Sequence, residues 1–130
     1  MRLKPGTRAK RAGQALVETA LVLPVLLGLI FGIFLFGRVY ASYLVVASAT
    51  RQGARLAAIG RGEAEVRAAV SETLAAAGLA SGASVSIAGT DGAAGDPVTV
   101  DVVAFLDSPV PVPGLPDPVP LAGRSVMRRE

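Results

Sequence analysis

A long run of apolar residues dominates the first third of the chain. Nineteen residues from Thr19 to Gly37 (TALVLPVLLGLIFGIFLFG) carry no charge, and they lie between Glu18 and Arg38. A helix rises about 1.5 Å per residue, so this run covers roughly 28 Å, close to the thickness of the hydrocarbon layer of a bilayer. The core helix of a soluble protein would show a polar stripe, and this run has none. The pattern therefore predicts a single membrane-spanning helix at about residues 19–37.

Helix-weakening residues inside the run fit a membrane environment. Pro24, Gly28 and Gly32 interrupt the leucines and valines, and membrane helices tolerate such residues better than soluble helices do. Gly28 and Gly32 form a G-x-x-x-G spacing that lets two helices approach closely. Two interpretations stay open: a packing role for Pro24, Gly28 and Gly32, or the general frequency of glycine in membrane helices.

Helical periodicity continues beyond the apolar run to about residue 59. Val39, Tyr43, Val46, Thr50 and Ala54 recur at helical spacing, and Gly60 and Gly62 end the pattern. The alanine-rich second half of this helix has two possible partners, sister subunits or the protein's own domain, and the sequence favours neither.

The remaining residues, 60–130, predict a small extracytoplasmic α+β domain. A helix is expected at residues 63–77 with Gly78 as its cap, and alternating residues indicate strands at 84–88, 98–106 and 121–128. Six prolines between residues 107 and 120 predict an extended loop. The last two strands are expected to pair, which gives a short antiparallel sheet backed by the helix at 63–77.

Charge is concentrated before the apolar run. Residues 1–13 form a basic leader with five basic residues and no acid. By the positive-inside rule this leader lies in the cytoplasm, and the C-terminal domain lies outside the membrane. Nucleic-acid binding by the leader is the competing explanation, but the apolar span that follows favours topology. We therefore expect a membrane partner and no nucleic acid.

Composition argues against an enzyme. The chain has no cysteine and no histidine, which removes disulfides, thiolate chemistry, the usual general base and the commonest metal ligand. Asp91, Asp96 and Asp101 lack the spacing of a calcium-binding EF-hand and are interpreted as turn and strand residues. The glycine-rich segment 89–95 lacks the lysine of a phosphate-binding loop. We expect no catalytic residue, metal, cofactor or small-molecule substrate.

Glu18 is the residue that breaks the pattern, because a carboxylate at the entry of a membrane span is costly. A solvated position among the lipid headgroups is one explanation. The surrounding sequence, from Gly13 to Glu18 (GQALVE), offers another: a basic leader and a glycine, with Glu at the fifth position after it. This arrangement resembles the prepilin-type signal of type IV pilin-like proteins.

A longer segment, residues 13–58, resembles the TadE-like family, which are minor pilin-like (pseudopilin) proteins of the tight-adherence pilus and secretion system. The shared features are the G-x-A-x-V-E-x-A-L-x-x-P start, the Phe-Gly-Arg at 36–38 and the A-x-x-x-G-A-R at 49–55. The Ser-Val-Met-Arg at 125–128 also resembles the family's last strand. Major pilins of this system usually carry Tyr after the Glu, whereas Thr19 stands here, which favours a minor component.

The resemblance implies that a prepilin peptidase cuts between Gly13 and Gln14. The new α-amino group would then lie near Glu18 of the same or a neighbouring subunit, and this pairing would offset the burial of the carboxylate. Other pilin-like subunits would be the partners, and the inner membrane the location. The full chain has a net charge of +3, and after cleavage eight basic and ten acidic residues would remain, a net charge of −2. The basic character therefore belongs largely to the leader.

Two other hypotheses explain the same span. The chain could be an uncleaved single-pass anchor whose outer domain binds a partner or ligand. It could also be a secreted protein cut by ordinary signal peptidase after the A-x-A at residues 47–49, although the apolar run is long for such a signal and the site lies far downstream of it.

Overall fold

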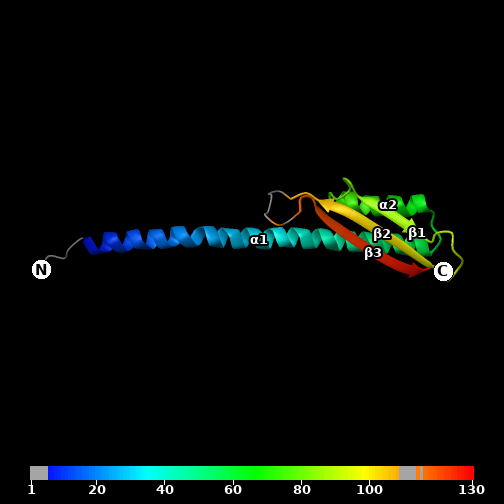
Figure 1. Ribbon diagram of the computed structural model, residues 1–130, viewed down its shortest axis with the longest axis horizontal. Coiled ribbons are helices and arrows are strands. Elements are labelled where there is room, and N and C mark those ends of the chain that lie inside the picture. Colours follow the sequence, from blue (N-terminus) through cyan, green and yellow to red (C-terminus); the bar gives the residue numbers. More distant parts are fainter. Residues whose placement is uncertain (1–5, 109–113, 115) are drawn as a thin grey trace. The chain divides into compact units, whose positions relative to one another are not determined.

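The computed structural model describes residues 6–108, 114 and 116–130, with side chains from Gly13 onward. Its elements are α1 (Gly6–Ala58), α2 (Glu63–Ala76), β1 (Ser84–Ala88), β2 (Pro97–Leu106) and β3 (Val119–Arg128), as Figure 1 shows. The strands form one antiparallel sheet in the order β1-β2-β3. The predicted α+β class is therefore confirmed, with a long N-terminal helix, a second helix and a three-stranded sheet. The predicted proline-rich loop lies partly outside the described residues.

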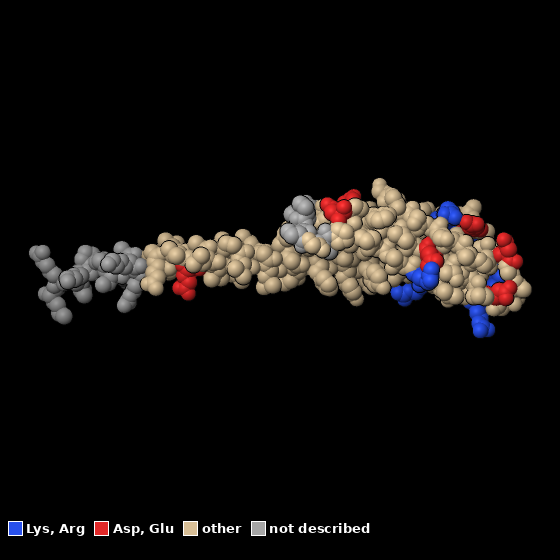
Figure 2. All heavy atoms as spheres, in the orientation of Figure 1, with Lys and Arg blue, Asp and Glu red and all other residues tan. Residues whose placement is uncertain are grey.

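The chain divides into two units, Met1–Arg38 and Val39–Glu130, each of which has its contacts mainly within itself. In the first unit, α1 is long and apolar enough to cross a membrane, and its described side chains are almost all exposed. Figure 2 shows one acidic side chain near the start of this part of α1 and otherwise uncharged residues, while the other charged side chains in view gather over the second unit. The described side chains of the first unit are thus almost all exposed, as expected of a helix whose surroundings are lipid.

Both helices end in the same way. Gly60 and Gly78 follow the ends of α1 and α2 with φ values of +80° and +71°. After α1, Arg61 N–H donates to the Leu56 carbonyl at 3.1 Å, and after α2, Leu79 N–H donates to the Leu74 carbonyl at 2.8 Å. These are Schellman motifs, which need a left-handed residue that glycine adopts without strain. The predicted helix ends are therefore placed by local backbone chemistry.

The core of the second unit lies between one face of the sheet and both helices. Alternate residues of β2 from Val98 to Leu106 point into it. α2 contributes Val66, Val70 and Leu74, and α1 contributes its small residues from Val46 onward. The sequence analysis placed only the second helix behind the sheet, and the structure adds the second half of α1.

The core contains few bulky side chains, and the elements instead pack with their backbones close together. A Cβ atom added to Gly53 of α1 would lie 2.7 Å from Val70 Cγ2 on α2 and 3.4 Å from Val100 Cγ1 on β2. A Cβ added to Gly123 of β3 would lie 2.5 Å from Thr50 Oγ1 on α1. The distances of 2.7 Å at Gly53 and 2.5 Å at Gly123 are too short for a real Cβ atom. These two glycines therefore set the distances of α2 and β3 from α1.

Hydrogen bonds close the end of the second unit. Glu130 N–H donates to the Ala58 carbonyl at 3.0 Å. Glu130 lies two residues after the end of β3, and Ala58 is the last residue of α1, so this bond ties the end of the sheet to the end of the helix. Arg129 Nη1 donates to the carbonyls of Thr90 and Gly92 in the β1–β2 loop. These bonds join the loop, the sheet and the helix at one edge.

The outer face of the sheet carries an ion pair across β2 and β3. Arg124 Nε lies 2.6 Å from Asp101 Oδ1, and Arg124 Nη2 lies 3.1 Å from Asp101 Oδ2. The two residues face each other in the strand register. The hydrogen bond from Arg124 lowers the pKa of Asp101, and the same contact raises the pKa of Arg124.

A larger residue at position 53 should destabilise the domain. We expect Gly53→Val to cost about 1–3 kcal/mol, the usual range for overpacking a core, measured as a lower Tm of the detergent-solubilised chain. Gly37→Val is the control, because Gly37 is also a helical glycine of α1 and an added Cβ atom there meets nothing within 4 Å, so helix propensity changes in the same direction without a clash. Equal Tm values for the two variants would show that α1 and α2 do not approach closely at Gly53.

The Asp101–Arg124 pair should make stability depend on pH in the acid range. A carboxyl whose pKa is lowered in the folded state stabilises the fold above its unfolded pKa, about 3.9, and this contribution disappears as pH falls through the lower folded pKa. We therefore expect Asp101→Asn to flatten the Tm–pH curve below about pH 4. In an Arg124→Gln background the same substitution should flatten it much less. An identical effect in both backgrounds would contradict the pairing.

Candidate assembly surface on the N-terminal helix

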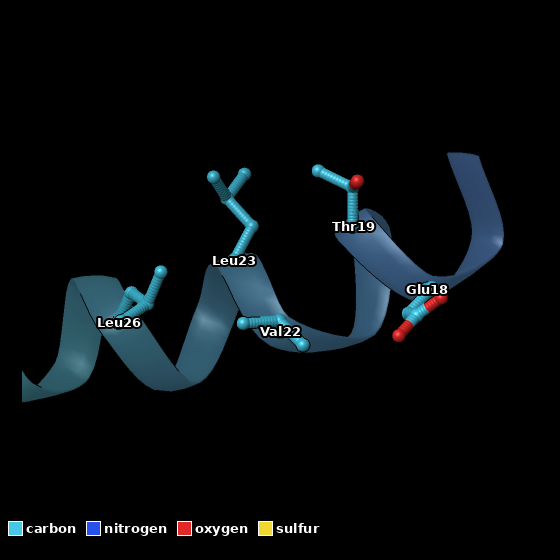
Figure 3. Close-up of a pocket in the computed structure, with 5 residues that line it drawn as sticks. All are labelled: Glu18, Thr19, Val22, Leu23 and Leu26. Carbon is cyan, nitrogen blue, oxygen red and sulfur yellow. The ribbon is translucent and has the colours of Figure 1, made fainter. Parts of the chain in front are cut away.

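Glu18 lies on α1 at the start of the apolar run. Its side chain has no hydrogen bond or ion pair within the part of the chain that the structure describes. It borders a shallow hollow on the helix surface, lined also by Thr19, Val22, Leu23 and Leu26. Figure 3 shows Thr19 and Leu23 on one flank and Glu18 on the other. A carboxylate beside leucine and valine side chains needs a counter-charge or water when lipid surrounds the helix.

Thr19, next to Glu18, meets its own hydrogen-bonding need. Its Oγ1 donates to the Ala15 carbonyl one turn earlier, at 2.9 Å, a bond that lets a hydroxyl enter a membrane helix at low cost. Glu18 has no comparable bond inside the helix. Of the polar groups around this hollow, Glu18 is the one that requires a partner from outside.

The predicted cleavage bond between Gly13 and Gln14 lies within α1, since the helix begins at Gly6. A Cβ atom added to Gly13 would meet nothing within 4 Å, so glycine is not required here by packing. Gln14 and Glu18 are four residues apart on a helix, and residues at this spacing share one face. The sequence analysis named both residues, and the helix places them one turn apart.

Pro24, Gly28 and Gly32 lie farther along the same helix. Pro24 is inside α1 and has no N–H, so the Ala20 carbonyl lacks its usual helical donor. Cβ atoms added to Gly28 or Gly32 would meet nothing within 4 Å. A second apolar hollow here is lined by Leu27, Gly28, Ile30, Phe31 and Phe34. Residues of α1 alone line this hollow, so the surface has room for another helix.

The predicted residues therefore form two patches on one helix and no single site. Glu18 and Gly28 are ten residues apart, about 15 Å along the axis. The first patch carries the Glu18 carboxylate, which has no partner where side chains are described, and the second patch is lined by apolar residues. Neither has the convergent polar groups of a catalytic centre.

The motif at residues 49–55 is not part of this surface. Ala49, Thr50, Gly53 and Ala54 are buried in the second unit, whereas Arg51 and Arg55 are exposed. The structure thus answers the question that the sequence left open, because the alanine-rich half of α1 packs on its own domain. Spacing could not show this, since small residues at helical intervals suit either partner.

Of the three aspartates that were considered as calcium ligands, Asp91, Asp96 and Asp101, the last two make contacts with other groups. Asp96 Oδ2 accepts a hydrogen bond from Ala93 N–H at 2.8 Å and so closes a turn, while Asp101 pairs with Arg124. Among the described residues no group of three or more acidic side chains is arranged to hold a metal ion. Asp96 therefore acts as the turn residue that the sequence predicted.

The fold and this surface define a class: a protein with one helix suited to anchor it in a membrane and a small α+β domain. The comparison with family models is more specific, because residues 13–55 match the model for TadE-like protein. This match confirms the predicted resemblance over the segment that contains Gly13, Glu18 and the buried motif at 49–55. It supports a minor-pilin-like role associated with a tight-adherence pilus. No curated protein and no solved structure matches the chain.

Proposed function

We propose that this chain is a minor pilin or pseudopilin of a bacterial tight-adherence pilus and secretion apparatus. It is a structural subunit without enzymatic activity, anchored in the inner membrane with its N-terminus in the cytoplasm and residues 60–130 outside. The observation that carries the proposal is Glu18, a carboxylate at the start of an exposed apolar helix with no hydrogen bond or ion pair among the described residues. The TadE-like match over residues 13–55 supports the same role.

The first step of this role is removal of the basic leader. A prepilin peptidase cuts between Gly13 and Gln14, which leaves Gln14 with a free, positively charged α-amino group. The open surroundings of Gly13 support access, although the peptidase must unwind this part of α1 to bind the bond in an extended form. The five basic residues of the leader leave with it.

The second step is assembly with other pilin-like subunits. The α-amino group of Gln14 is the counter-charge for Glu18, either one helical turn away in the same subunit or across a contact between two subunits. In a medium of low dielectric such a pair is far more favourable than an isolated carboxylate. The open face at Gly28 and Gly32 gives a neighbouring helix room to approach.

The alternative of an uncleaved anchor with a binding domain uses the same span. It assigns no purpose to Gly13 at the end of the basic leader or to Glu18 at the start of the apolar run. The signal-peptidase alternative conflicts with burial, since Ala49 is fully buried and residues 47–49 lie within α1. Cleavage there would remove part of α1 and leave the sheet without the residues at 46 and 49.

Intact mass spectrometry of the protein extracted from its own membranes tests processing. We expect a chain that begins at Gln14, and we expect Gly13→Leu to remain full length. Gly37→Leu is the matched control, because both glycines are helical and have nothing within 4 Å of an added Cβ atom. A full-length wild-type chain would favour the uncleaved anchor, and loss of residues 1–49 would favour signal peptidase.

A substitution of Glu18 tests assembly separately from processing. We expect Glu18→Gln to mature normally but to lose most of its cross-linking to other pilin-like subunits, since a neutral amide cannot pair with an α-amino group. Thr19→Val, which removes only a hydroxyl already bonded to Ala15, should cross-link like the wild type. Normal cross-linking by Glu18→Gln would contradict the assigned role of the carboxylate.

A further inference from the structure

A short part of α1, residues 39–45, follows the predicted span and precedes the fully buried core, with Val39 and Val45 partly buried against that core. The first fully buried residue of the second unit is Val46. Before it, Tyr40, Tyr43 and Leu44 expose 55%, 47% and 47% of their surfaces. Three large side chains within five residues therefore stay about half exposed, a patch that suits an apolar environment outside the domain. We call residues 39–45 the juxtamembrane segment.

Tyrosine is confined to this segment. The chain contains two tyrosines and no tryptophan, and both tyrosines lie here. Arg38 precedes the segment directly, and no other charged residue occurs between Glu18 and Arg51. Tyrosine is enriched at membrane–water interfaces because its ring is apolar and its hydroxyl is polar. The basic side chain of Arg38 can extend toward the lipid phosphates.

Helix length also places the juxtamembrane segment at the depth of the lipid headgroups. Residues 19–37 account for about 28 Å, close to the hydrocarbon layer of roughly 30 Å. The polar headgroup layers bring the bilayer to about 40–45 Å, so each contributes roughly 5–8 Å. Residues 38–43 rise about 9 Å, which matches one such layer. The two tyrosines therefore fall at the outer boundary of the bilayer.

We infer that the juxtamembrane segment is a lipid-binding surface, with Tyr40 and Tyr43 in the headgroup layer and their hydroxyls among the lipid phosphates and glycerol groups. The occupant is lipid and not a neighbouring helix. Helix contacts in membranes favour glycine and alanine, whereas this face presents two tyrosines and a leucine. The inference rests on the membrane anchor and holds whether or not the leader is cleaved or the chain enters a filament.

The absence of tryptophan allows a direct test by fluorescence. Single variants Tyr40→Trp and Tyr43→Trp of the full chain are reconstituted at low density in phosphatidylethanolamine–phosphatidylglycerol vesicles. The lipids carry bromine either near the headgroup or near the end of the acyl chain. We expect both tryptophans to be quenched more strongly by the headgroup-proximal bromine, with blue-shifted emission and weak quenching by aqueous iodide.

Two matched variants calibrate the depth. Leu26→Trp lies near the middle of the apolar run, so the bromine near the acyl-chain end should quench it most. Val126→Trp lies on β3 toward the end of the sheet away from the juxtamembrane segment, where Val126 is 56% exposed, and iodide alone should quench it.

Each other result overturns the inference. Iodide quenching of the Tyr40 and Tyr43 variants at the level of the Val126 variant would place the segment in water. Shielding from both iodide and bromine would place it against protein. If Leu26→Trp also escaped quenching by the deep bromine, the membrane anchor would fail together with this inference. If the deep bromine quenched Leu26→Trp while iodide quenched Tyr40→Trp, the inference of a lipid-binding segment would be wrong. The membrane anchor and the proposed pilin role would remain.

Discussion

The close packing of α2 and β3 against α1 is the constraint on which the folded domain depends. The chain is rich in alanine, valine and leucine and poor in aromatic residues, so its core cannot be filled by a few large side chains. The backbones come together instead, at Gly53 and Gly123. Dense packing of small groups still removes apolar surface from water and gains dispersion energy, but it tolerates no extra atoms at the points of contact.

The same residue type has opposite consequences in the two parts of α1. Gly53 is surrounded by valines, whereas Gly28 and Gly32 face open space. In water the small residues of α1 are covered by the chain's own sheet and second helix. In the membrane the corresponding contacts must come from lipid or from another protein, so this half of the helix can be understood only together with its surroundings. The same holds for Glu18, whose carboxylate needs a counter-charge or water from the surroundings of the helix.

Most of the fold could be predicted because its signals are local. Alternation in β2, the glycines after both helices and the acidic first turn of α2 each reflect nearby backbone chemistry. The partner of Ala49 and Gly53 could not be predicted, since helical spacing is the same for internal and external contacts. β3 begins at Val119, two residues before the predicted start, because Pro120 is acceptable on an edge strand. Gly13, Glu18 and Gly28 were recognised by pattern, yet their partners lie outside the chain.

The hydrogen bond from Glu130 to Ala58 has a consequence for biosynthesis. The sheet that covers the second half of α1 is translated after α2, so this face of the helix leaves the ribosome before the strands exist. The face consists mainly of small residues, with Ala49, Thr50, Ala54 and Ala57 beside Val46, so it exposes little apolar surface while the apolar run enters the membrane. Small residues thus suit the order of events as well as the final packing, and the domain closes only when the segment around Arg129 arrives.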